Sequence, residues 1–152
     1  MNYLDANFAT ALHFSIRGQT ELAERFVRKN SMAIIFSELA ALECRRAFIM
    51  RNGKPNSENW IRLQALVASG AWQRDLIHWR ALSEKAEALI DRFGVKLRAG
   101  TLDTLHIAQA MLSGCTRFLS FDTNSSARVL AVSCGLQVFP ELSVMEKGRV
   151  VC

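Results

Sequence analysis

The stretch SMAIIFSELAALE, residues 31–43, carries the clearest indication of the fold. Its first half is a continuous apolar run, which is typical of a short strand buried on both faces of a parallel sheet. Ser37 follows this run and is a suitable N-cap for a helix over the residues behind it. A buried strand that leads directly into a helix is the unit from which α/β folds are built.

The same order of strand and helix recurs on both sides of this stretch. Short strands are predicted at residues 1–4, 31–36, 117–121 and 136–139, and helices at 7–17, 20–29, 37–51, 57–69, 82–93, 101–113 and 124–133. Gly94 is expected to end the helix before it, and WQRDLIHW, residues 72–79, is ambiguous between an extended and an irregular conformation. The sequence therefore predicts one domain over residues 1–152, a three-layer α/β/α fold with a short central parallel sheet of about four strands.

Composition excludes several classes of protein. With 50% hydrophobic and 22% charged residues, the chain of 152 residues is globular rather than disordered. No apolar run is long enough to span a membrane, and the N-terminus lacks the pattern of a signal segment. Four scattered cysteines (Cys44, Cys115, Cys134 and Cys152) argue against a zinc site and a disulfide framework. We expect a cytoplasmic protein with reduced thiols and no membrane partner.

The formal net charge of +5 favours a polyanionic partner, of which nucleic acid is the commonest. The basic residues that are candidates for holding a phosphate backbone are Arg17, Arg45, Arg46, Arg92, Lys96 and Arg98. Each of them is also explained as an ordinary solvated surface charge.

Polar side chains occupy positions that a parallel sheet brings together. Asp5, Ser37 and Asp122 each follow a predicted strand. Because parallel strands all end at one edge of the sheet, we expect these side chains to lie along a single rim. Asp5 and Asp122 are also explained as helix N-caps. Asp103, in the first turn of a helix that Thr101 opens, is also explained by the helix dipole.

Glu43 is the acid that a surface role explains least well. Leu39, Ala40 and Ala47 lie one helical turn from it and are apolar, so its carboxylate lies on or beside the inward face of the helix. An unpaired buried carboxylate is costly. Either Arg46, at i+3, pairs with Glu43, or Glu43 reaches toward the rim as a ligand.

Several carboxylates on one rim need a compensating charge. Two unit charges about 5 Å apart repel by roughly 3 kcal/mol at an effective dielectric of about 20. Such a cluster takes up protons or holds a cation, and oxygen ligands favour the hard ions Mg²⁺ and Mn²⁺. A bound ion of this kind supports hydrolysis of a phosphodiester.

Four segments of the chain each place apolar residues around one acid. They are YLDAN (3–7), SELAALE (37–43), LDTLHIAQA (102–110) and FLSFDTN (118–124). In this order and spacing they resemble the PIN-domain nucleases, and within them the VapC-like toxins of type II toxin–antitoxin pairs. The resemblance implies a small metal-dependent ribonuclease that uses Mg²⁺ or Mn²⁺. Matched motif by motif, it implies catalytic and metal-binding acids at Asp5, Glu43, Asp103 and Asp122, with Asn7, Ser37 and Asn124 in supporting positions.

The resemblance also implies an RNA substrate, a cognate antitoxin protein and a homodimer. It gives no role to residues 52–93, and His106 is expected to pack or hydrogen-bond rather than act as a general base. Two alternatives remain open. One is a PIN-fold module that binds RNA in a larger complex with little or no turnover. The other is a phosphatase that attacks phosphate covalently, although Asn7 stands where such enzymes commonly have a second acid.

Overall fold

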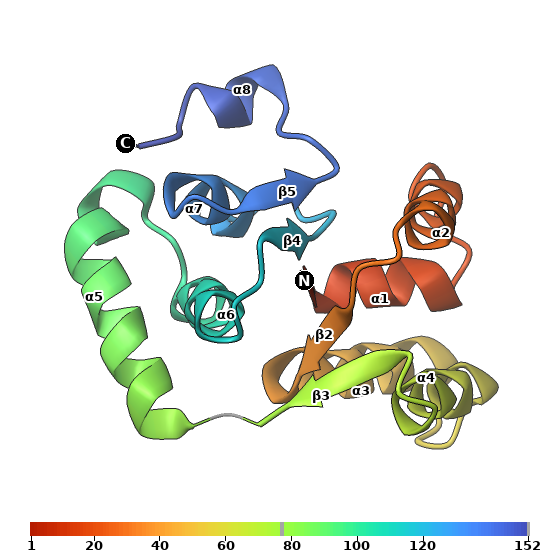
Figure 1. Cartoon of the computed structure of the whole chain (residues 1–152). Coiled ribbons are helices and arrows are strands. Elements are labelled where there is room, and N and C mark those ends of the chain that lie inside the picture. Colours follow the sequence, from red (N-terminus) through yellow and green to blue (C-terminus); the bar gives the residue numbers. More distant parts are fainter. Residues whose placement is uncertain (77, 152) are drawn as a thin grey trace.

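Five parallel strands form the centre of the computed structural model, which describes residues 1–76 and 78–151 (Figure 1). The strands are β1 (Asn2–Leu4), β2 (Ile34–Ser37), β3 (Trp72–Asp75), β4 (Arg117–Leu119) and β5 (Gln137–Phe139). They lie in the order β3-β2-β1-β4-β5, and every neighbouring pair is parallel. The predicted parallel sheet is confirmed. It has one strand more than predicted, and this additional strand, β3, lies in the segment whose conformation was ambiguous in the sequence.

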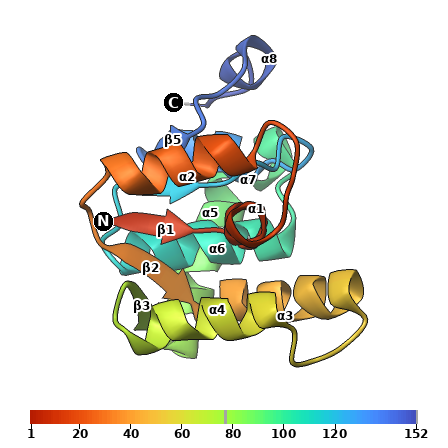
Figure 2. The same ribbon diagram turned by 90° about the vertical axis from the view of Figure 1, so that its right-hand side faces the viewer.

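Helices cover both faces of this sheet (Figures 1 and 2). On one face lie α1 (Ala6–His13), α2 (Thr20–Lys29), α3 (Glu38–Asn52) and α4 (Glu58–Ala68), and on the other α5 (Trp79–Leu97), α6 (Thr101–Leu112) and α7 (Ala127–Ser133). A short helix, α8 (Val144–Lys147), follows β5. The predicted three-layer α/β/α arrangement is confirmed.

The hydrophobic core has two parts, one on each face of the sheet, because successive side chains along each strand alternate between the faces. Leu4, Phe36 and Leu119 pack with the α1–α4 layer, whereas their strand neighbours Tyr3 and Phe118 pack with the α5–α7 layer. Successive side chains of a strand point to opposite faces, so each strand contributes to both cores. The continuous apolar composition of these strands follows from burial on both faces.

The expectation that a helix ends at Gly94 is wrong. α5 continues through Gly94 and ends at Leu97, with Arg98 as its C-cap at a φ of +51°. Phe93 and Leu97 are both buried on either side of the glycine. Burying these side chains outweighs the cost of about 1 kcal/mol that glycine carries inside a helix.

Other helices differ from their predicted bounds at the ends. α1 stops at His13 rather than Arg17, and α7 begins at Ala127 rather than residue 124. α8 was not predicted, although Ser143 and Glu146 form a capping box that is readable in the sequence.

Cys44, Cys115 and Cys134 are free thiols, and the first two are buried. Burial raises the pKa of both buried thiols, which makes them unreactive. Cys152 lies outside the described residues. Among the residues that the structure describes, no helix combines the length and apolar character needed to cross a bilayer.

Candidate functional site

Asp5 lies at the carboxyl edge of the sheet, where β1 leads directly into α1. It is the N-cap of α1, and its Oδ1 accepts a hydrogen bond from the Ala6 amide at 2.7 Å. Its Oδ2 accepts one from Asn7 Nδ2, also at 2.7 Å. Asn7 is fixed in turn, because it donates to the Ser120 hydroxyl and accepts from the Phe121 amide. Asp5 is therefore the N-cap of α1. Its carboxylate is also held in place by Asn7, which is bonded to the residues that follow β4.

Glu43 reaches the same edge from α3 and pairs with a histidine. Its Oε2 lies 2.7 Å from Nε2 of His106 on α6. The alternative partner, Arg46, forms no ion pair with it among the described residues. One oxygen of Asp5, one of Glu43 and one ring nitrogen of His106 all lie within 4.8 Å of one another. His106 makes the hydrogen bonds that its position in the sequence led us to expect.

A chain of buried hydrogen bonds orients His106. The Ala40 amide donates to Ser37 Oγ, which lies 2.5 Å from the Tyr3 hydroxyl, and that hydroxyl lies 2.9 Å from His106 Nδ1. Tyr3 and Ser37 are fully buried. With a neutral imidazole, Tyr3 donates to Nδ1 and Nε2 donates to Glu43. Ser37 thus caps α3 and, through Tyr3, helps to orient His106.

Removing the Tyr3 hydroxyl should destabilise the protein. We expect Tyr3→Phe to lower the free energy of unfolding by about 1–3 kcal/mol, because Ser37 and His106 each lose a buried partner. Urea denaturation of Tyr3→Phe, Ser37→Ala and the double variant measures this effect. The double variant should cost less than the sum of the single ones, since both remove the same hydrogen bond. Strict additivity would contradict the hydrogen-bond chain.

Asp103 and Asp122 line the same pocket as Asp5 and Glu43, a cavity of about 680 Å³. Asp103 is half-buried in the first turn of α6, as predicted. Neither Asp103 nor Asp122 belongs to the compact group formed by Asp5, Glu43 and His106. The four acids therefore share one pocket, and two of them, Asp5 and Glu43, meet His106 at one point of it.

Asp122 stabilises the loop that follows β4. Its Oδ1 accepts hydrogen bonds from the amides of Asn124 and Ser125. It does not cap α7, because the N-cap position of that helix is Ser126. Asn124 is exposed and contributes its backbone amide to this loop, but it does not line the acidic pocket.

Burial and repulsion raise the pKa values of the acids in this pocket. Burial raises the pKa of Asp5, and the negative charge of Glu43 adds to the rise. Burial likewise raises the pKa of Asp103, with a contribution from Asp122. Burial of His106 opposes its protonation, but the hydrogen bond to Glu43 and the surrounding carboxylates raise its pKa on balance. A pocket with these properties favours an additional positive charge.

Sequence reasoning missed several groups that shape this pocket. Arg51 lines it together with Arg46, which was one of the six basic candidates. Arg51 lies two helical turns after Glu43, and this spacing is the signal that identifies it. Tyr3 and Ser120 are polar side chains at otherwise apolar strand positions, which is the corresponding signal for them.

The sheet order and the acids at its carboxyl edge define an α/β protein with a candidate metal centre. The chain belongs to the PIN domain family, whose model matches residues 3–129. This confirms the family resemblance.

The fold is similar to that of two solved structures. One is VapC20 of Mycobacterium tuberculosis, described as a sarcin-ricin loop cleaving toxin, with a TM-score of 0.70, 16% identity, and coverage of 92% of this chain and 100% of that chain. The other is FitAcB of Neisseria gonorrhoeae, with a TM-score of 0.59, 14% identity, and coverage of 91% and 96%. No curated protein matches the chain.

Proposed function

We propose that the chain is a metal-dependent ribonuclease that hydrolyses RNA phosphodiesters and acts as the toxin of a toxin–antitoxin pair. The observation that carries this proposal is the meeting of Asp5, Glu43 and His106 within 4.8 Å in a pocket that Asp103 and Asp122 also line. Similarity of fold to VapC20, a toxin that cleaves the sarcin-ricin loop, supports RNA as the class of substrate.

The side chains of the pocket fit Mg²⁺ or Mn²⁺. Asp5, Glu43, Asp103 and Asp122 offer carboxylate oxygens, the ligands that these hard ions prefer. When bound, such an ion supplies Lewis-acid stabilisation for hydrolysis of a phosphodiester. His106 orients Glu43 through its Nε2, in the way that hydrogen-bond partners commonly orient metal ligands.

Other residues of the pocket serve orientation and binding. Asn7 holds Asp5 in one rotamer by bonding its Oδ2 while tied to the end of β4. Arg46 and Arg51 on α3 bring positive charge to the wall of the pocket, where an RNA phosphate would approach. Contacts of this kind make RNA binding sensitive to salt.

Metal binding and RNA cleavage test the proposal together. Cleavage of single-stranded RNA should require Mg²⁺ or Mn²⁺ and stop when a chelator is added. Glu43→Gln should weaken Mn²⁺ binding, measured by calorimetry, at least about tenfold. The matched control is Glu84→Gln on the exposed side of α5, which should change neither. RNA binding without cleavage in any divalent ion would contradict the proposal and favour the RNA-binding module.

A cognate antitoxin and a homodimer belong to the same proposal, with residues 1–152 acting as one PIN-like domain in the cytoplasm. Leu76 and Trp79 are 72% and 63% exposed and offer apolar surface for either contact. Free thiols at Cys44, Cys115 and Cys134 fit a reducing compartment. A monomer that co-purifies with no small protein from a neighbouring gene would count against the partners.

A further inference from the structure

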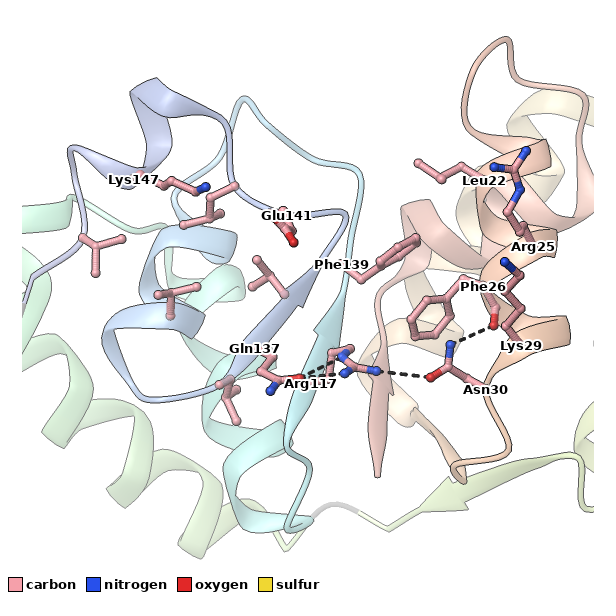
Figure 3. Close-up of a pocket in the computed structure, with 15 residues that line it drawn as sticks. Leu22, Arg25, Phe26, Lys29, Asn30, Arg117, Gln137, Phe139, Glu141 and Lys147 are labelled. Carbon is pink, nitrogen blue, oxygen red and sulfur yellow. Dashed lines mark hydrogen bonds between the residues drawn. The ribbon is translucent and has the colours of Figure 1, made fainter.

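A second cavity, of about 1000 Å³, shares no lining residue with the acidic pocket. It lies between α2 and the C-terminal segment of residues 141–150, with β5 between them (Figure 3). Leu22, Arg25 and Lys29 come from the α2 wall, and Glu141 and Lys147 come from the opposite wall. We call this cavity the β5 groove.

The inner surface of the β5 groove is apolar. Leu22, Val138 and Leu142 are among the aliphatic side chains that line it. Phe26 and Phe139 also line it, and their ring centroids lie 4.2 Å apart. The guanidinium of Arg117 lies over the ring of Phe26, 5.6 Å from its centroid. The groove thus offers mainly aliphatic surface, and the ring of Phe26 is largely covered, with the residue only 7% exposed.

The rim of the groove carries more basic than acidic side chains. Arg25, Lys29, Arg117 and Lys147 line it, against the single acid Glu141. Among the described residues, none of these four basic side chains forms an ion pair.

Arg117 shows this lack of a counter-charge most clearly. Its Nη2 donates to the amide oxygen of Gln137 at 2.7 Å, and its Nη1 donates to that of Asn30 at 3.3 Å (Figure 3). Both acceptors are neutral. The groove therefore presents a positive potential over an apolar surface, which complements a negatively charged and partly apolar partner.

β5 brings a free strand edge to this groove. It is the last strand of the described sheet and pairs only with β4. The Gln137 amide and the Phe139 carbonyl are used toward β4, in bonds with Thr116 and Ser120. In a parallel pair, the intervening residue directs its amide and carbonyl to the other side. Within residues 1–76 and 78–151, Val138, which lines the groove, thus offers an unpaired donor and acceptor.

We propose that the β5 groove binds an extended acidic segment of a partner protein, which adds a strand beside β5. Its backbone pairs with Val138, its alternate apolar side chains contact the aliphatic lining, and its carboxylates face Arg25, Lys29, Arg117 and Lys147. Single-stranded RNA fits less well, because base stacking needs open aromatic faces, whereas Phe26 is buried and the rest of the lining is mainly aliphatic. This binding does not depend on the nuclease activity.

A synthetic peptide tests the groove directly. The probe is a fluorescein-labelled decapeptide of alternating glutamate and valine, and the comparison peptide has lysine in place of glutamate. We expect saturable binding of the acidic peptide, measured by anisotropy without divalent ions. The double variant Arg25→Glu/Lys29→Glu should weaken it at least about tenfold. In the wild type, the peptide should slow hydrogen exchange of the Val138 amide.

The matched control is Lys54→Glu/Lys96→Glu, which changes the net charge equally but lies outside the groove. It should bind the acidic peptide as the wild type does. Equal losses in both double variants, equal binding of the lysine peptide, or no binding at all would overturn the proposal. Labelled oligouridine that binds more tightly than the acidic peptide, and is lost in the same groove variant, would overturn it in favour of nucleic acid.

Discussion

Replacing Asp5 with asparagine should lower metal-dependent RNA cleavage at least about 100-fold while the fold remains intact. Asparagine has almost the shape of aspartate and is equally good as an N-cap, so α1 keeps its start. What it lacks is the negative charge that would hold a cation beside Glu43 and His106. Cleavage of labelled RNA in Mn²⁺, followed by gel electrophoresis, measures the loss.

The stability of Asp5→Asn separates a catalytic effect from a folding effect. Burial raises the pKa of Asp5, so its ionisation at neutral pH costs folding stability relative to the unfolded chain. The metal-free variant should therefore melt near the temperature of the wild type, because relief of the buried charge offsets the loss of the hydrogen bond from Asn7 Nδ2. Mn²⁺ should stabilise the wild type but not the variant, because only the wild type holds the ion tightly.

The control for this prediction is Asp91→Asn, an exposed acid on α5. It removes the same charge far from the pocket and should retain full activity. Cleavage by Asp5→Asn at the rate of the wild type would contradict the proposed role of the acids. An unfolded Asp5→Asn protein would contradict the expectation that the buried charge is unfavourable without metal.

The second large effect should come from Glu146→Gln, which breaks a buried ion pair. Arg128 Nε lies 2.8 Å from Glu146 Oε1, and their side chains are 2% and 6% exposed. Leaving the Arg128 charge without its partner should lower the free energy of unfolding by about 3–5 kcal/mol. Urea denaturation at pH 7 measures this loss. Arg128 also donates to the carbonyls of Ser120 and Glu141, so the pair joins the C-terminal segment to the end of β4.

An exposed ion pair provides the control. Arg80 and Glu84 pair on α5 with side chains that are 93% and 65% exposed. Glu84→Gln should therefore cost less than about 1 kcal/mol. A similar cost for Glu84→Gln and Glu146→Gln would show that burial is not the source of the effect.

The pH dependence of the Glu146 effect has a definite sign. Burial of Glu146 opposes its ionisation, but hydrogen bonds from Arg128 and Ser143 lower its pKa below the ordinary value. This stabilisation is present above the unfolded-state pKa of about 4.3 and is lost as pH falls through the folded-state pKa. The difference in stability between the wild type and Glu146→Gln should thus shrink below about pH 4.

The ion pair of Arg128 and Glu146 connects the acidic pocket with the β5 groove. Through Ser120, Arg128 contacts the strand end that holds Asn7 and, through it, Asp5. Through Glu146, it holds the segment that forms one wall of the β5 groove. Loss of the pair should therefore weaken peptide binding in the groove as well as stability.

The sequence by itself determined the fold class and the positions of the candidate acids. Short apolar strands such as residues 34–37 are recognisable because burial on both faces requires an unbroken apolar run. The positions of Asp5 and Asp122 at the carboxyl edge of the sheet were predictable, because parallel strands all end at that edge. These properties are local or follow from topology, so periodicity and order along the chain are sufficient to predict them.

Only the tertiary structure decided the partners of these residues. Glu43 pairs with His106, which lies 63 positions away, rather than with the nearby Arg46. α5 runs through Gly94 because Phe93 and Leu97 find buried positions. The β5 groove combines α2 with a C-terminal segment in which no helix or strand was predicted. Such contacts depend on how elements far apart in the sequence pack against one another. The local sequence around each residue does not specify this packing.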